Sequence, residues 1–180
     1  MKYIALLRGV NVGGKNKLSM QALKEDLIQH GFSQVETYIN SGNILFSSDE
    51  KDETVLQSQI EMLIKNKYHI DTTVAIISSD DLIEALAHAP IWWNKDKESK
   101  HNAIFVIPPL TAEEIFVQIG DIKPEYERVD FYGKVIFWSA PLKTFSKTRW
   151  SKVVASKTYS NITIRNANTI MKLLFLIQST

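Results

Sequence analysis

Residues 35–48 read VETYINSGNILFSS, and this stretch decides the fold because it predicts a β-hairpin. Residues 35–39 and 44–48 are rich in the β-branched and aromatic side chains that strands favour. The four residues between them, Asn40-Ser41-Gly42-Asn43, favour a tight turn. The sheet that contains this hairpin is therefore at least partly antiparallel.

The segments on either side of the hairpin complete a βαββαβ order. Residues 3–7 (YIALL) are a continuous apolar run, which is typical of a strand buried on both faces. A helix is expected next, with Ser19 as its N-cap and Gly31 just after its end. Residues 56–64 carry apolar side chains at helical spacing, and residues 72–77 are rich in β-branched side chains. This order is typical of a ferredoxin-like unit.

The second half of the chain repeats the order less regularly. We assign residues 1–78 to a first ferredoxin-like βαββαβ unit, residues 79–102 to a helical linker and residues 103–165 to a second such unit. Residues 146–157 are expected to form the second helix of that unit. A C-terminal helix within residues 166–180 is apolar on nearly all sides, so we expect it to be buried and to pack on both units. The predicted fold class is α+β with antiparallel hairpins.

The composition excludes several classes of site. The chain of 180 residues has no cysteine, so it has no disulfide framework, no thiol nucleophile and no Cys-ligated zinc. The four histidines, His101 among them, lack the spacing of a metal site and are expected at the surface. We therefore predict no metal and no cofactor. No apolar run is long enough to span a bilayer, so we expect no membrane partner and a cytoplasmic location.

Charge is distributed unevenly along the chain. All 20 acidic residues and 13 of the 21 basic residues lie in residues 1–130, whereas residues 131–180 carry eight basic residues and no acidic one. This asymmetry indicates either an anionic partner or pairing between the two parts. We expect a secondary basic surface in the C-terminal part, formed by Lys147, Arg149, Lys152 and Arg165. It is either a nucleic-acid surface or a solvated basic face.

A glycine-rich loop follows the first strand. Residues 9–16 (GVNVGGKN) match the phosphate-binding pattern G-x-x-x-x-G-K-[ST] except at Asn16, where a nucleotide triphosphatase needs a hydroxyl to hold magnesium. We therefore expect no ATPase or GTPase activity. With Lys15 and Lys17, the loop can still bind a phosphate or carboxylate through its backbone N–H groups. It can also be a structural loop whose glycines permit positive φ.

Topology predicts which loops meet. In a βαββαβ unit, the loop after the first strand and the hairpin between the second and third strands lie at the same end of the sheet. The first and third strands are also neighbours, so the two loops are expected in contact. We predict an anion-binding site there, formed by Arg8, Asn11, Gly13, Gly14, Lys15, Asn16, Lys17, Ser41, Gly42 and Asn43. The alternative is that the asparagines only hold the loops together as a structural clasp.

Three motifs carry a family resemblance. Residues 6–17 (LLRGVNVGGKNK), 38–43 (YINSGN) and 163–173 (TIRNANTIMKL) resemble the bacterial domain-of-unknown-function family 1697 and occur in its order. Relatives usually carry Trp at the position of Ala167. The resemblance implies an α+β fold over nearly the whole chain, and it implies no activity.

The function predicted from these features is the binding of an anionic ligand, either a phosphorylated metabolite or a nucleic acid. One alternative is a small enzyme that acts on a phosphorylated substrate through the same loop. Another is a protein-interaction domain, for which Trp92 and Trp93 would form an exposed apolar patch. Nothing in the sequence predicts the oligomeric state.

Overall fold

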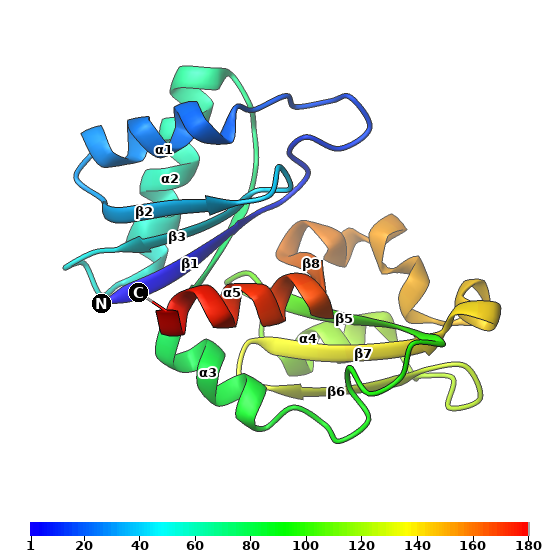
Figure 1. Cartoon of the computed structure of the whole chain (residues 1–180). Coiled ribbons are helices and arrows are strands. Elements are labelled where there is room, and N and C mark those ends of the chain that lie inside the picture. Colours follow the sequence, from blue (N-terminus) through cyan, green and yellow to red (C-terminus); the bar gives the residue numbers. More distant parts are fainter. Residues whose placement is uncertain (180) are drawn as a thin grey trace. The chain divides into compact units, whose positions relative to one another are not determined.

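The computed structural model describes residues 1–179 (Figure 1). They form two compact units, one of Met1–Asp81 with Ser179 and one of Leu82–Gln178. Each unit contains a four-stranded sheet in which neighbouring strands are antiparallel. The predicted α+β class, with two ferredoxin-like βαββαβ units and a C-terminal helix, is confirmed.

The first unit has the strand order β2-β3-β1-β4. Its elements are β1 (Lys2–Leu7), α1 (Met20–Gln29), β2 (Ser33–Tyr38), β3 (Asn43–Ser47), α2 (Glu53–Tyr68) and β4 (Val74–Ser78). The predicted helix start is confirmed, since the Ser19 hydroxyl accepts a hydrogen bond from the Ala22 amide at 3.2 Å. Both faces of β1 are buried, as its continuous apolar sequence predicts.

Helix α2 protects the open edge of this sheet at β4. Glu61 Oε1 accepts the Val74 amide at 2.9 Å, and Glu53 Oε1 accepts the Ser78 amide at 3.1 Å. An edge strand exposes backbone donors that invite pairing with another chain. The two carboxylates satisfy such donors from within the unit.

A buried carboxylate joins α1 to α2. Asp26 on α1 accepts hydrogen bonds from Lys67 Nζ and from the Tyr68 hydroxyl on α2. The hydrogen bond from Lys67 is the main cause that lowers the pKa of Asp26, and the bond from Tyr68 adds to it. Desolvation and the hydrogen bond to Asp26 raise the pKa of Tyr68. The cluster therefore holds an ionised carboxylate between the helices.

The second unit has the equivalent strand order, β6-β7-β5-β8. Its elements are α3 (Ser79–Ala87, which begins at the end of the first unit), β5 (Ser99–Val106), α4 (Ala112–Ile119), β6 (Arg128–Tyr132), β7 (Val135–Pro141), the 3₁₀ helices η1 (Leu142–Lys147), η2 (Trp150–Ala155) and η3 (Lys157–Asn161), β8 (Ile162–Asn166) and α5 (Ala167–Ser179). Strand β5 begins four residues before the expected start of this unit. Trp150 is fully buried in the core, as its spacing predicts.

The α-helix predicted for residues 146–157 is wrong, because this segment forms 3₁₀ turns instead. Its hydroxyl side chains bond to carbonyls three residues earlier. Thr148 donates to Phe145 O at 2.7 Å, and Ser156 donates to Val153 O at 2.6 Å. Such local bonds compete with the α-helical ladder, so the apolar periodicity alone misidentified the element.

The C-terminal helix α5 is less buried than its sequence suggests. Met171 and Phe175 are 42% and 58% exposed, whereas Ile170 and Leu173 are fully buried. The expected burial on nearly all sides is therefore wrong. Its predicted packing on both units stays a prediction. Over residues 1–179, the structure has no helix of the length and apolarity needed to cross a membrane.

Candidate functional site

Three loops meet at one end of the first sheet, and we call them the rim: residues 8–17, 40–43 and 72–73. Leu6 pairs with Asn43, and the Leu7 amide donates to Gly42 O at 2.8 Å. The predicted contact between the first two loops is thus confirmed. The third loop joins them because β4 is antiparallel to β1 and therefore begins where β1 ends.

The loop of residues 8–17 is a closed hairpin with a tight tip. The Lys15 amide donates to Val12 O at 3.0 Å, around Gly13 and Gly14 at φ +59° and +75°. Positive φ at both central residues is the conformation of a type I′ turn, which glycines adopt without strain. The loop tip therefore has a defined shape.

Asparagine side chains close the loop and attach it to the hairpin turn. Asn11 Nδ2 donates to Leu18 O and to Asn40 O, both at 2.8 Å, and Asn11 Oδ1 accepts the Leu18 amide at 2.8 Å. Asn16 Nδ2 donates to Gly9 O at 3.0 Å. The structural clasp that the sequence offered as an alternative is therefore present.

The hairpin turn is fixed in the same way. Asn43 is fully buried, and its Nδ2 donates to Tyr38 O at 3.0 Å and to Ser41 Oγ at 3.1 Å. Gly42 has φ +81°, and a Cβ atom there would lie 2.6 Å from Leu7 Cβ. Only glycine allows the two loops to approach this closely.

Arg8 is held by the third loop, whose place at the rim was not predicted from the sequence. Arg8 Nη2 lies 3.4 Å from Thr73 Oγ1, and Thr72 Oγ1 donates to Arg8 O at 2.7 Å. The Arg8 amide also donates to Thr73 O at 3.0 Å. The antiparallel pairing of β1 with β4 could have located these threonines, because it places the start of β4 at the rim.

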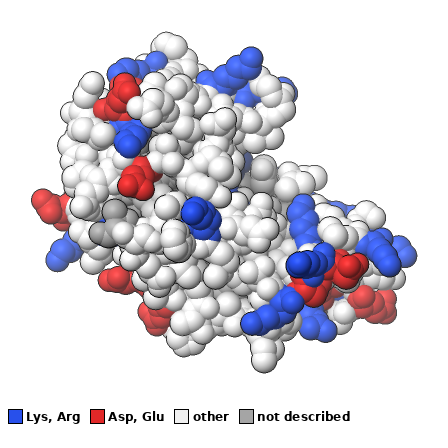
Figure 2. Space-filling model, viewed as in Figure 1, with Lys and Arg blue, Asp and Glu red and all other residues white. Residues whose placement is uncertain are grey.

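The exposed charges of the first two rim loops, residues 8–17 and 40–43, are positive. Lys15 and Lys17 are exposed, and neither residues 8–17 nor residues 40–43 include a carboxylate. Figure 2 shows basic side chains over the projecting loop at the upper right, without acidic side chains beside them in this view. Within the described part of the chain, the amides of Gly13 and Gly14 donate no hydrogen bond. Binding by these groups stays a prediction.

Comparison with known proteins places the chain in a family. The model of the family described as "Protein of unknown function (DUF1697)" matches residues 1–137. The chain belongs to this family. The match confirms the resemblance and includes both rim loops of this DUF1697 protein.

One solved structure extends the likeness to most of the chain. It is described as the structure of the conserved bacterial protein SP0830 from Streptococcus pneumoniae, which is 32% identical with a TM-score of 0.84. The alignment covers 95% of each chain, so the DUF1697 chain and this protein share both units. No curated protein matches the chain.

The secondary basic surface of the DUF1697 chain is smaller than predicted. Lys147, Arg149 and Lys152 are exposed along η1 and η2, and none of them forms an ion pair with a carboxylate of residues 1–179. Arg165, however, is only 8% exposed and donates to Thr163 Oγ1 at 2.9 Å. Burial lowers its pKa to about 10. Arg165 therefore does not belong to an exposed surface.

One further expectation about side chains is wrong. His101 is buried and hydrogen-bonded rather than exposed. Trp93 is also buried, and its Nε1 donates to Asn102 O at 2.9 Å, so this side chain gives no support to the alternative of a protein-interaction domain. Within residues 1–179, no group of three or more His, Asp or Glu side chains could hold a metal ion.

Proposed function

We propose that the rim of this DUF1697 protein binds a phosphate-bearing anion. The observation that carries the proposal is the loop tip, where the free amides of Gly13 and Gly14 lie beside Lys15 and Lys17 with no carboxylate in either hairpin. Backbone donors combined with lysine charges bind phosphate without needing a particular nucleotide base. A cytoplasmic location is part of the proposal, and imaging of a tagged protein in cells would test it.

The hydrogen bonds of the clasp support this function rather than oppose it. Asn11 and Asn16 fix the backbone of the loop, while the side chains of Lys15 and Lys17 take no part in the clasp. A ligand that binds a loop already in its bound shape does not pay for ordering that loop. In this proposal the asparagines therefore hold the loop in shape, and the lysines bind the ligand.

A thermal-shift screen tests the proposal. Nucleotides, sugar phosphates and short oligonucleotides are compared, because a ligand that binds only the native state raises the melting temperature. Lys15→Ala with Lys17→Ala should weaken binding about ten-fold or more, since hydrogen bonds to charged groups contribute roughly 1.5–3 kcal/mol each. It should leave the melting temperature of the ligand-free protein unchanged.

The control removes the same charge from the exposed basic surface of the second unit, Lys147→Ala with Lys152→Ala. If this variant loses binding and the rim variant keeps it, the ligand binds the C-terminal basic surface and the proposal is wrong. For a single-stranded oligonucleotide, contacts with Arg8, Lys15 and Lys17 give a slope of log K against log salt of about −2. If the rim instead binds a small phosphorylated molecule, the affinity for oligonucleotides does not increase with their length.

A further inference from the structure

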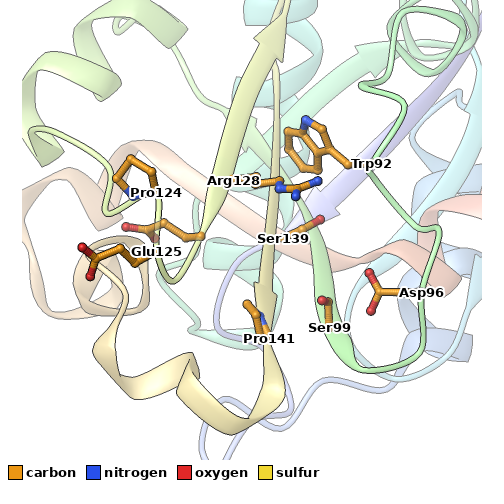
Figure 3. A pocket seen from close by; sticks show the side chains of 9 residues that line it. Trp92, Asp96, Ser99, Pro124, Glu125, Arg128, Ser139 and Pro141 are labelled. Atoms are coloured by element: carbon orange, nitrogen blue, oxygen red, sulfur yellow. The ribbon is translucent and has the colours of Figure 1, made fainter.

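A polar cavity of about 220 Å³ opens in the second unit (Figure 3). Its walls come from the segment before β5, the turn before β6 and strands β5 to β7. They are formed by Trp92, Asp96, Ser99, Pro124, Glu125, Glu127, Arg128, Ser139 and Pro141. The cavity is smaller than the roughly 300–1,000 Å³ pockets that bind drug-sized ligands, so its occupant is a small molecule.

The hydrogen bonds of His101 determine how Ser139 faces the cavity. The Asn94 amide donates to His101 Nδ1 at 3.1 Å, so this nitrogen carries no proton. Nε2 carries the proton instead and donates to Asp96 O at 2.9 Å. The Ser139 hydroxyl, 2.6 Å from Nδ1, must therefore donate its proton to His101. Its oxygen is left as an acceptor on the cavity wall.

The same bonds argue against Ser139 as a nucleophile. A general base must take the proton of the serine hydroxyl. A proton taken up by His101 Nδ1 would face the amide hydrogen of Asn94, and the hydrogen bond from Asn94 would be lost. The geometry therefore favours a Ser139–His101 pair that holds a fixed acceptor.

Asp96 adds a negative charge near this acceptor. A hydrogen bond from Ser99 is the main cause that lowers the pKa of Asp96, so its carboxylate is ionised at neutral pH. Its side chain is 51% exposed and can reach a ligand.

Glu127 lines the cavity but is already satisfied by the protein. Its Oε1 accepts the Lys123 amide at 3.0 Å and the Arg149 amide at 2.8 Å, and its Oε2 accepts the Trp150 amide at 3.0 Å. These three donors stabilise the buried carboxylate. Glu127 therefore shapes the wall rather than binding a ligand.

Arg128 supplies the positive charge of the cavity. It is the cross-strand partner of Ser139, and Figure 3 shows its guanidinium between Trp92 and Ser139. Its side chain is exposed and forms no ion pair with any carboxylate of residues 1–179. A guanidinium in this state can bind a ligand carboxylate through two hydrogen bonds.

We propose that this cavity binds a small zwitterion of the α-amino-acid type. Its ammonium donates to Ser139 and to the Asp96 carboxylate, and its carboxylate binds Arg128. A simple anion would be repelled by Asp96 and Glu125, and a simple amine would be repelled by Arg128. Only a ligand that carries both charges can pair with Ser139 and Asp96 through its ammonium and with Arg128 through its carboxylate. This site is independent of the anion binding proposed for the rim.

Calorimetry on the full chain tests the proposal with the standard free L-α-amino acids at millimolar concentration. The best binder is then compared with its N-acetyl derivative, which lacks the ammonium, and with its amide, which lacks the carboxylate. Each derivative should bind about ten-fold more weakly or worse, because each loses a charge-assisted bond. Equal binding of either derivative, or no binding by any free amino acid, overturns the proposal.

Variants locate the site. Arg128→Gln should abolish most of the affinity for the free amino acid but leave the binding of its amide unchanged, and Asp96→Asn should weaken the free amino acid. Arg149→Gln removes an exposed arginine elsewhere in the same unit and should leave binding unchanged. All three changes are at exposed positions, and circular dichroism checks that the fold is retained. Unchanged affinity in Arg128→Gln refutes the assignment of this cavity.

Discussion

Gly42→Ala should destabilise the first unit more than any ordinary surface substitution. At φ +81°, alanine adopts a left-handed conformation that costs about 1–2 kcal/mol. Its Cβ would also lie 2.6 Å from Leu7 Cβ and 2.7 Å from Val10 Cγ2, both of which belong to buried residues. Overpacking of this kind costs about 1–3 kcal/mol. The two effects together lower the free energy of unfolding by roughly 2–5 kcal/mol.

Urea unfolding followed by circular dichroism measures this loss as a lower midpoint at an unchanged slope. Gly14→Ala is the matched control, because Gly14 has φ +75° and a Cβ there would meet no atom within 4 Å. It should cost only the conformational part, about 1–2 kcal/mol. Both glycines lie in the first unit, so the second unit affects both measurements equally. Equal losses for the two variants would mean that close packing of the loops contributes nothing.

Three further changes test other contacts by the same unfolding measurement. Asn11→Ala should lower the free energy of unfolding by about 1–3 kcal/mol, because the Leu18 amide loses its partner at the rim; unchanged stability would disprove the clasp. Because the folded-state pKa of Asp26 lies below its ordinary 3.8, the stability from this carboxylate is present above that pH and lost as the pH falls further. Asp26→Asn should therefore flatten the acid limb of a pH titration of stability, and an identical limb would contradict the ionised cluster. Glu127→Gln replaces an acceptor of backbone amides with a donor and should cost about 1–3 kcal/mol, whereas a neutral result would show that these hydrogen bonds are not needed.

Local signals in the sequence determined most of the first unit. The turn at residues 40–43, the cap at Ser19 and the apolar run of β1 each act within a few residues, so they need no knowledge of the rest of the chain. The helical crossover makes β1 and β2 parallel, and the strand directions then determine which end of the sheet each loop occupies. These rules together predicted that residues 8–17 meet the hairpin turn, as they do.

Local signals were weaker in the second unit. The apolar spacing around Trp150 correctly predicted its burial, but the same spacing suits an α-helix and a series of 3₁₀ turns. The hydroxyls of Thr148 and Ser156 decided between them by bonding to nearby carbonyls. Hydrophobic periodicity reports which side chains are inward and not which hydrogen-bond ladder the backbone makes.

Tertiary structure alone decided which polar residues are functional candidates. In the sequence, Arg165 resembles any other basic residue. In the structure it lies in β8 and is buried, because burial depends on what packs against the strand. Ser139 and His101 are 38 residues apart and become partners only through the pairing of β5 with β7. Arg128 reaches the same cavity through the pairing of β6 with β7. Contacts of this kind have no local signature, since they depend on the register of strands that are distant in sequence.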